Sequence, residues 1–163
     1  MKSGAARRQS PQRRLGLRGG AGRCTVRVRE SYSRFNAHRI MSTITVYTYA
    51  NCDSCRRAVK WLRAQRLVFV EKPIRETPPS ATELKAMLAV QGGELRKLFN
   101  TSGLDYRAQG LGAKLSTMIE ADALRLLAGN GNLVKRPFLW RAPDQVGLVG
   151  FDEALWSAAL LTT

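Results

Sequence analysis

The spacing of apolar residues alternates between strand-like and helical segments along most of the chain. Residues 43–49 (TITVYTY) and 67–74 (LVFVEKPI) are rich in β-branched and aromatic residues and predict two strands, the second buried on both faces. Between them, apolar positions from Cys55 to Leu62 have helical spacing and predict a helix over 52–65. Strand, helix and strand with short joints make a βαβ unit, whose strands we expect to be parallel with a right-handed crossover.

A largely helical block is predicted over residues 80–129. Ser80 and Glu83 have the spacing of a capping box and predict the start of the first helix of this block. Thr117 and Glu120 repeat that spacing and predict the start of its last helix. The segment between these two helices contains shorter helical and irregular stretches.

Strand character returns after the helical block. Residues 133–140 and 146–150 predict two strands joined by a short turn, and we expect these strands to pair antiparallel. Residues 151–161 predict a closing helix. The order of elements indicates an α/β chain that contains both a parallel and an antiparallel pair of strands.

Composition changes this picture mainly for residues 1–40. The chain carries a net charge of +15, and residues 1–40 contain eleven Lys and Arg but a single acid, Glu30. They offer little apolar surface to offset the entropy of ordering, so we expect a disordered basic extension before one domain over 41–163. Three interpretations stay open: an over-long start ahead of a natural initiator at Met41, a solvated arm, or an organelle-targeting segment. Nucleic acid, if bound at all, is expected to contact only this extension.

Two further features limit the class of protein. No apolar run approaches the roughly 18 residues that a membrane span requires, so we expect a soluble protein with no membrane partner. The three cysteines, Cys24, Cys52 and Cys55, are too few for a disulfide-stapled secreted domain and indicate the reducing cytoplasm.

Cys52 and Cys55 are the main candidates for chemistry. Cys52 falls where a strand turns into a helix, and the free N–H groups and helix dipole at such a position stabilise a thiolate, the reactive form. Cys55, one turn on, can then form a disulfide with Cys52, so we expect an exposed nucleophile and a more buried resolving thiol. Two alternatives stay open: a pair of inert buried cysteines, or half of a zinc site, although the single histidine, His38, leaves few further ligands.

Arg136 and Pro137 form the second candidate feature. An Arg-Pro peptide directly before a strand can be cis, which changes where the neighbouring backbone points. Arg136 could then bring a fixed charge to the cysteine pair, to hold an anion or a thiolate. The alternative interpretation is a surface arginine before a proline of an edge strand.

These stretches together resemble the ArsC/Spx family of thioredoxin-fold proteins. The resemblance covers nearly all of residues 44–160, and it implies a thioredoxin-like four-stranded mixed sheet with a helical insertion at about 80–129. It also identifies Pro137 with the family's cis-proline and favours Arg136 as an active-site residue. The matching segments, in the family's order, are YTYANCDSCRRAVKWL, LFNTSGLDYR, NLVKRPFLW and LVGFDEALW.

The resemblance implies a cytoplasmic thiol–disulfide oxidoreductase in which Cys52 attacks the substrate and Cys55 resolves the adduct. It implies no metal or organic cofactor, with glutathione as a candidate co-substrate. Glutaredoxin with glutathione, or thioredoxin, would be the reductant. The Spx-like branch of the family implies an alternative, a redox-sensing transcriptional regulator that binds the C-terminal domain of the RNA polymerase α subunit.

Arsenate reductases of this family surround the oxyanion with several arginines. Arg136 retains one of them, whereas Asn100 and Gly150 stand where two others are expected. Loss of two guanidinium groups removes much of the charge-assisted hydrogen bonding that an oxyanion needs, so we expect inefficient arsenate reduction. The resemblance makes Asn100, Arg107 and Pro137 candidate substrate-binding residues.

Overall fold

The computed structural model describes residues 43–162, so the extension predicted over residues 1–40 lies outside the described residues. The predicted order of elements is confirmed, with the helical block divided into five helices. The strands are β1 Ile44–Thr48, β2 Phe69–Pro73, β3 Phe138–Arg141 and β4 Val146–Val149. The helices are α1 Asp53–Ala64, α2 Ala81–Val90, α3 Leu95–Leu98, α4 Leu104–Ala108, α5 Leu111–Lys114, α6 Glu120–Gly129 and α7 Glu153–Leu161, with one 3-10 helix, η1 Gly131–Leu133.

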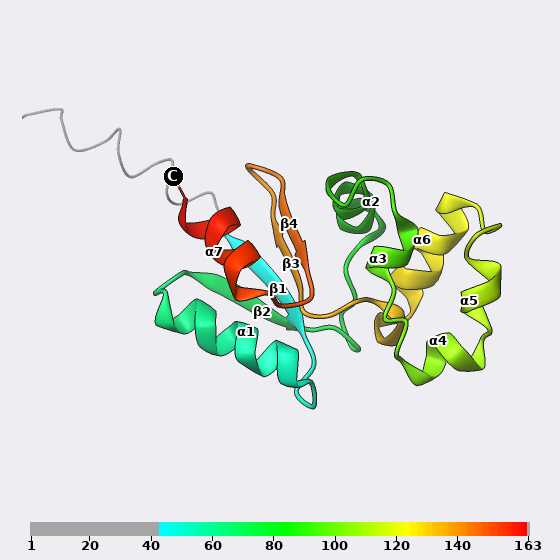
Figure 1. The fold of residues 1–163 in the computed structure, drawn as a ribbon, viewed down its shortest axis with the longest axis horizontal. Helices are drawn as coiled ribbons and strands as arrows, with labels where there is room; N and C mark the ends of the chain where they lie inside the picture. The colour runs from blue at the N-terminus through cyan, green and yellow to red at the C-terminus, as the bar shows by residue number, and fades with distance from the viewer. Residues whose placement is uncertain (1–42, 163) are drawn as a thin grey trace, which may run out of the picture. The chain divides into compact units, whose positions relative to one another are not determined.

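The four strands form one mixed sheet in the order β2-β1-β3-β4. β1 pairs parallel with β2 and antiparallel with β3, and β3 pairs antiparallel with β4. This arrangement confirms the predicted α/β class and the four-stranded mixed sheet. Helices α1 and α7 lie on one side of the sheet, and α2 to α6 lie on the other (Figure 1).

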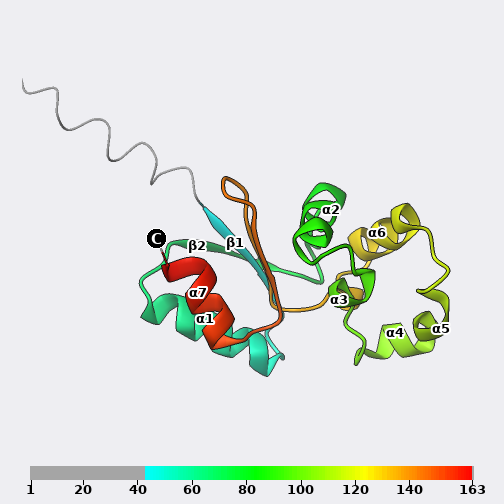
Figure 2. The same cartoon turned by 45° about the horizontal axis from the view of Figure 1, so that its top comes forward.

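The alternation of side chains along the central strands divides the core into two clusters. Val46 and Leu139 point to the side of α1 and α7, whereas Tyr47 and Phe138 point to the helical block. Both clusters are closed to water, and the same separation of layers is visible after a 45° turn (Figure 2). The cluster under α1 and α7 contains Ile44, Val46, Ala58, Trp61, Leu62, Leu139, Trp156 and Leu160.

Helix α2 begins with the capping box that the sequence predicts, and one residue of this box also bonds to the sheet. The Ser80 hydroxyl accepts a hydrogen bond from the Glu83 N–H at 3.2 Å, and the Glu83 carboxylate accepts one from the Ser80 N–H at 2.9 Å. The buried Tyr47 hydroxyl of β1 also donates to this carboxylate, at 2.9 Å. A polar contact with the sheet therefore fixes the same residue that caps the helix.

Two local predictions are wrong. β2 is an edge strand and is not buried on both faces: Val70 is half exposed, and only one face, which includes Phe69, packs partly on the core. Helix α6 begins without the predicted capping box, because the Thr117 hydroxyl bonds to the Lys114 carbonyl instead, at 3.1 Å.

Among the described residues, no helix combines the length and the apolar character needed to cross a membrane.

The helical block is connected to the sheet by the chain that enters β3. A β-bridge joins Phe99 to Val134, the Asn100 N–H donates to the Leu133 carbonyl at 2.7 Å, and the Lys135 N–H donates to the Leu98 carbonyl at 2.7 Å. These contacts place the end of α3 beside the segment that leads to residues 136–137.

Gly131 lies where η1 contacts the end of β2. A Cβ atom added to Gly131 would lie 1.7 Å from the carbonyl oxygen of Ile74, which is backbone and has little freedom to move. Gly129, two residues earlier in α6, has no atom within 4 Å of the same added group. The close contact between η1 and the chain after β2 therefore requires glycine at position 131, whereas position 129 has room for a side chain.

We predict that Gly131→Ala lowers the free energy of unfolding by about 3 kcal/mol, the upper part of the range for overpacking. Gly129→Ala is the matched control and should raise it by about 0.5 to 1 kcal/mol, because alanine is the better helix former. Urea denaturation of the two variants measures both changes. Equal stabilities for the two variants would contradict the close contact at Gly131.

Candidate redox site at the start of helix α1

Cys52 is the N-cap residue of α1, as the sequence predicts. Its backbone is extended, with φ −122° and ψ 116°, and its sulfur accepts a hydrogen bond from the Cys55 N–H at 3.4 Å. The backbone N–H of Cys52 donates to the Tyr49 carbonyl at 3.1 Å, which closes the turn between β1 and the helix. The half-buried Cys52 thus places its sulfur at the first turn of the helix, where free N–H groups favour a thiolate.

Cys55 lies one turn further along α1 and is buried, with 1% of its surface exposed. Burial raises the pKa of the Cys55 thiol to about 12, and the hydrogen bond with Cys52 contributes to the rise. A backbone hydrogen bond with Tyr49 and the charge of Arg136 act in the opposite direction. Both thiols are free, so the predicted order of burial, with Cys55 the more buried, is found in the reduced pair.

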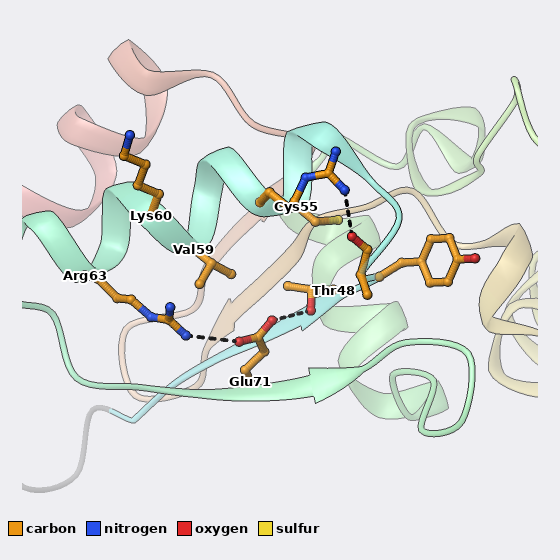
Figure 3. A pocket seen from close by; sticks show the side chains of 9 residues that line it. Thr48, Cys55, Val59, Lys60, Arg63 and Glu71 are labelled. Carbon is orange, nitrogen blue, oxygen red and sulfur yellow. Dashed lines mark hydrogen bonds and ion pairs between the residues drawn. The ribbon is translucent and has the colours of Figure 1, made fainter.

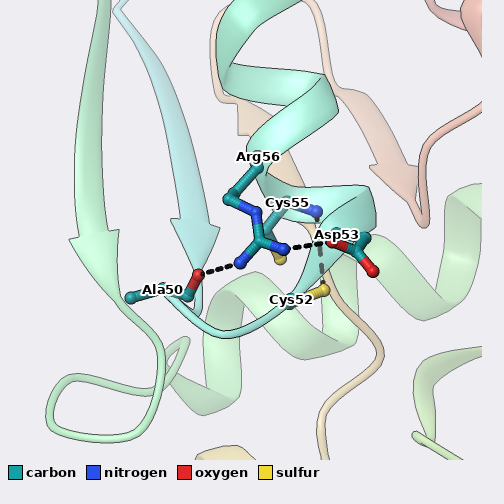
Figure 4. Close-up of polar contacts among 5 residues, drawn as sticks. All are labelled: Ala50, Cys52, Asp53, Cys55 and Arg56. Atoms are coloured by element: carbon teal, nitrogen blue, oxygen red, sulfur yellow. Dashed lines mark hydrogen bonds and ion pairs between the residues drawn. The ribbon is translucent and has the colours of Figure 1, made fainter.

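Arg56 lies one turn beyond Cys52 but directs its guanidinium elsewhere. It donates to the Ala50 carbonyl at 2.9 Å and forms an ion pair with Asp53, as Figure 4 shows. Because Arg56 and Asp53 neutralise each other on the exposed surface, Arg56 brings little net charge to the sulfur of Cys52.

A cavity of about 370 Å³ runs along α1 on the side that faces β2, and Cys55 is part of its wall (Figure 3). Glu71 crosses this cavity, accepting a hydrogen bond from the Thr48 hydroxyl at 2.6 Å and pairing with Arg63 at 3.9 Å. Cys52 is not part of the cavity wall. The Cys55 thiol therefore faces this cavity and Cys52 does not.

Arg136 lies two residues before β3, and its positive charge acts on Cys55. The peptide bond between Arg136 and Pro137 is cis, and the Pro137 carbonyl accepts a hydrogen bond from the Gly150 N–H at 2.8 Å. The Arg136 guanidinium carbon lies 5.0 Å from the centre of the Tyr49 ring, within cation–π range. Its Nη1 is buried and has no hydrogen-bond partner among residues 43–162.

Asn100 shares a cavity with Arg136. The Asn100 side-chain amide donates to the Asn132 carbonyl at 3.2 Å, and Asn100, Asn132 and Arg136 line the same space of about 340 Å³. The structure thus brings Arg136, Asn100 and Pro137 to the edge of the sheet where Cys52 lies. Arg107, the remaining candidate, is exposed on α4 and is not among the residues that line this cavity.

Gly150 stands where the family resemblance leads us to expect an arginine, and its backbone conformation favours glycine. It follows β4 in the left-handed region, with φ +74°, a conformation that residues with a side chain rarely adopt. The backbone turn that leads from β4 toward α7 therefore favours glycine here.

Within residues 43–162, no three His, Cys, Asp or Glu side chains are grouped so that they could hold a metal ion.

Sequence reasoning missed Arg75 and assigned no role to the side chain of Tyr49. The Arg75 guanidinium carbon lies 4.0 Å from the centre of the Tyr49 ring, and Arg75 lines the cavity of Arg136. The signal was present in the predicted βαβ unit, since the carboxyl ends of parallel strands meet at one edge of a sheet. Tyr49 follows β1 and Arg75 follows β2, so both belong to that edge.

Comparison with known proteins places the sequence in one family. The model described as ArsC family matches residues 47–159, which confirms the predicted family. An uncharacterized protein, YusI of Bacillus subtilis (strain 168), is 46% identical over 111 residues, covering 68% of this chain and 92% of YusI. The global transcriptional regulator Spx of Enterococcus faecalis (strain ATCC 700802 / V583) is 32% identical over 111 residues, covering 68% of this chain and 80% of the regulator.

Solved structures agree with the fold and the family. An ArsC family related protein from Bacteroides fragilis has a TM-score of 0.67 at 35% identity, with 73% of this chain and 98% of that chain covered. A possible arsenate reductase from Streptococcus mutans UA159 has a TM-score of 0.63 at 37% identity, with 68% and 92% covered. These likenesses confirm the expected thioredoxin-like architecture with its helical insertion.

We predict that iodoacetamide at pH 8 labels Cys52 and leaves Cys55 almost untouched. A thiol with a pKa of about 12 has about 10⁻⁴ of its population as thiolate at pH 8, and the thiolate is the form that reacts. Labelling of Cys55 should rise about tenfold for each pH unit up to pH 11. Peptide mapping by mass spectrometry separates the two sites and Cys24, and Cys52→Ser is the control in which Cys55 stays slow. Equal labelling of Cys52 and Cys55 at pH 8 would contradict the protonated state of Cys55.

Proposed function

This chain belongs to the ArsC family, and we propose that it is a thiol–disulfide oxidoreductase of the reducing cytoplasm. The observation that carries this proposal is the asymmetry of the cysteine pair. Cys52 is half-buried and its sulfur caps α1, and the buried Cys55 lies one turn away. Such a pair suits a nucleophile followed by a resolving thiol.

In the first step of the proposed reaction, the Cys52 thiolate attacks one sulfur of a disulfide substrate. The sulfur–sulfur bond of the substrate breaks, a mixed disulfide forms on Cys52, and the other half of the substrate leaves as a thiolate that takes up a proton from solvent. Arg136 lies at the same edge of the sheet, where its buried and unpartnered Nη1 can donate a hydrogen bond to an anionic group of the substrate.

In the second step, Cys55 attacks the Cys52 sulfur and releases the bound half of the substrate as a thiol. Formation of the mixed disulfide removes the hydrogen bond with Cys52 and the nearby Cys52 charge, two of the causes that raise the pKa of Cys55. The Tyr49 backbone and the Arg136 charge, which lower this pKa, remain. Burial, the first cause of the raised pKa, also remains, so the reaction of Cys52 makes Cys55 easier to deprotonate without removing the main cause of its high pKa.

The product of one cycle is a Cys52–Cys55 disulfide and a substrate reduced by two electrons. Two thiols must supply these electrons to restore the pair, either glutathione with glutaredoxin or the dithiol of thioredoxin. Neither step requires a metal or an organic cofactor, because thiol exchange forms and breaks only sulfur–sulfur bonds.

Arsenate is a poor substrate in this proposal. Asn100 offers an amide where an arginine is expected, and Gly150 stands in a turn that favours glycine. An amide forms a weaker hydrogen bond to a doubly charged oxyanion than a guanidinium does. A possible arsenate reductase is among the similar solved structures, but those words describe that protein.

A second candidate function is a redox-sensing regulator, favoured by the 32% identity with Spx of Enterococcus faecalis. In this function the Cys52–Cys55 disulfide would act as a switch, and the reduced or oxidised chain would bind the C-terminal domain of the RNA polymerase α subunit. A pull-down of the full chain with that domain, in the presence and absence of reductant, tests this directly. Redox-dependent capture supports the regulator, and no capture in either state contradicts it.

We predict that the full chain reduces a small disulfide with glutathione and glutaredoxin, or with thioredoxin, much faster than it reduces arsenate. Cys52→Ser should lower turnover to the background rate, because it removes the attacking atom. Cys55→Ser should retain the first step and accumulate a mixed disulfide on Cys52, visible in the intact mass. Arg136→Gln should lower kcat/KM by about tenfold or more, the loss of one charge-assisted hydrogen bond.

The comparison of variants decides between enzyme and switch. Full turnover in Cys55→Ser would make Cys55 a bystander. Absence of turnover with every substrate, together with a titratable Cys52–Cys55 disulfide, would contradict the enzyme and support the switch.

A further inference from the structure

Two guanidinium groups meet at the ring of Tyr49. The guanidinium carbon of Arg75 lies 4.0 Å from the ring centre and that of Arg136 lies 5.0 Å from it. The negative face of an aromatic ring attracts cations, so Tyr49 stabilises both positions. Because both groups lie so close to one point, they are separated by less than the Debye length of about 10 Å at 0.1 M salt, and their fields add.

The turn after β1 places the backbone of Tyr49 beside that of the nucleophile. Tyr49 directly follows β1, and its carbonyl accepts the N–H of Cys52 at 3.1 Å. Thr48 of β1 is paired with Pro73 of β2, so Arg75 arrives from the neighbouring parallel strand at the same edge. The sheet thus sets the backbone position of Arg75, and its exposed side chain reaches the Tyr49 ring.

The cavity next to the two arginines is open and polar. It measures about 340 Å³, and its lining includes Arg75, Arg136, Asn100, Ser102 and Asn132. The Nη1 of Arg136 and the Oδ1 of Asn132 are buried without a hydrogen-bond partner among the described residues. The Arg136 Nη1 is a donor, so an anionic ligand that accepts a hydrogen bond from it would be stabilised, whereas the Asn132 Oδ1 accepts only and would need a donor on the ligand.

One carboxylate, Asp105, also lines this cavity. It accepts hydrogen bonds from the side-chain amides of Asn130 at 2.9 Å and Asn132 at 3.2 Å, and these bonds together with the charge of Arg75 lower the pKa of Asp105. No acid within residues 43–162 comes within 4.0 Å of Arg75 or Arg136 to form an ion pair. Two cations and one anion leave the lining with a net positive charge.

We propose that Arg75 is the second cation of the site and that it acts with Arg136 to bind a carboxylate on the disulfide that reacts with Cys52. This inference rests on the proposed function, since the carboxylate belongs to the molecule that Cys52 attacks. Arg75 provides part of the positive charge that the sequence lacks at Asn100 and Gly150. The site therefore selects anionic disulfides over neutral ones of similar size.

The test is the rate of a single thiol exchange, which needs no turnover. In the full chain carrying Cys24→Ser and Cys55→Ser, the Cys52 thiolate attacks 5,5′-dithiobis(2-nitrobenzoate), which carries two carboxylates, or neutral 4,4′-dithiodipyridine. In each case one aromatic thiolate or thione leaves and is measured by absorbance. Arg75→Gln should slow the reaction with the anionic probe about tenfold relative to the neutral probe, as expected for one charge-assisted hydrogen bond.

Three further variants make the result specific to Arg75. Arg125→Gln on α6 removes the same charge from an exposed ion pair with Asp122, and it should leave the ratio of the two rates unchanged. Arg75→Lys should restore part of the preference, because it keeps the charge but loses the planar group. Tyr49→Leu should lower the preference, because it removes the ring that both guanidinium groups contact.

Salt separates an electrostatic role from a structural one. The preference of the chain with Arg75 intact for the anionic probe should fall as ionic strength rises, whereas that of Arg75→Gln should change little. Equal slowing of both probes in Arg75→Gln would show a structural role and overturn the proposal. No slowing of either probe would show that Arg75 does not take part in binding the anionic probe and would overturn it as well.

The outcome is distinguishable from a failure of the proposed function. If the full chain turns over no disulfide but Cys52 retains an Arg75-dependent preference for the anionic probe, the result supports anion binding by Arg75 and contradicts the proposed enzyme. If turnover occurs and Arg75→Gln leaves the ratio of the two rates unchanged, the result supports the proposed enzyme and contradicts anion binding by Arg75.

Discussion

The hydrogen bonding of β1 to two neighbours, one parallel and one antiparallel, is the constraint on which the site depends. Parallel pairing with β2 brings the ends of both strands to one edge, and antiparallel pairing with β3 brings the beginning of β3 to the same edge. The residues just beyond these ends, Tyr49 and Cys52, Arg75, and Arg136 with Pro137, therefore meet although they are up to about 88 positions apart in the sequence. A strand paired only on one side could not assemble them.

The helical block completes one wall of the cavity beside Arg136. The bridge between Phe99 and Val134 joins the end of α3 to the chain that enters β3, and this connection holds Asn100 close to Arg136. The same backbone contacts that attach the block to the sheet therefore also shape the space next to Arg136. On the other side of α1, Cys55 stays buried and protonated, since burial raises the pKa of its thiol. The two cysteines differ because their surroundings differ.

Much of the fold could be predicted from periodicity and capping signals, because local rules decide those elements. The βαβ unit, the N-cap position of Cys52 and the Ser80 capping box are all set by a few neighbouring residues. The predicted burial of β2 was wrong, because the burial of a strand depends on its place in the sheet order. The predicted start of α6 was wrong, because the Thr117 hydroxyl bonds to the Lys114 carbonyl. Arg75 was missed for a similar reason: its role depends on which strand ends meet in space, and no local pattern of the sequence records that.

The most direct test of a redox-active pair is an equilibrium titration of the full chain against oxidised and reduced glutathione, followed by intact mass after the free thiols are quenched. We predict one reversible transition in which the protein loses two hydrogens and Cys52 and Cys55 become joined by a disulfide in the same molecule. A stable mixed disulfide of glutathione on Cys52, with Cys55 still free at every ratio, would contradict it.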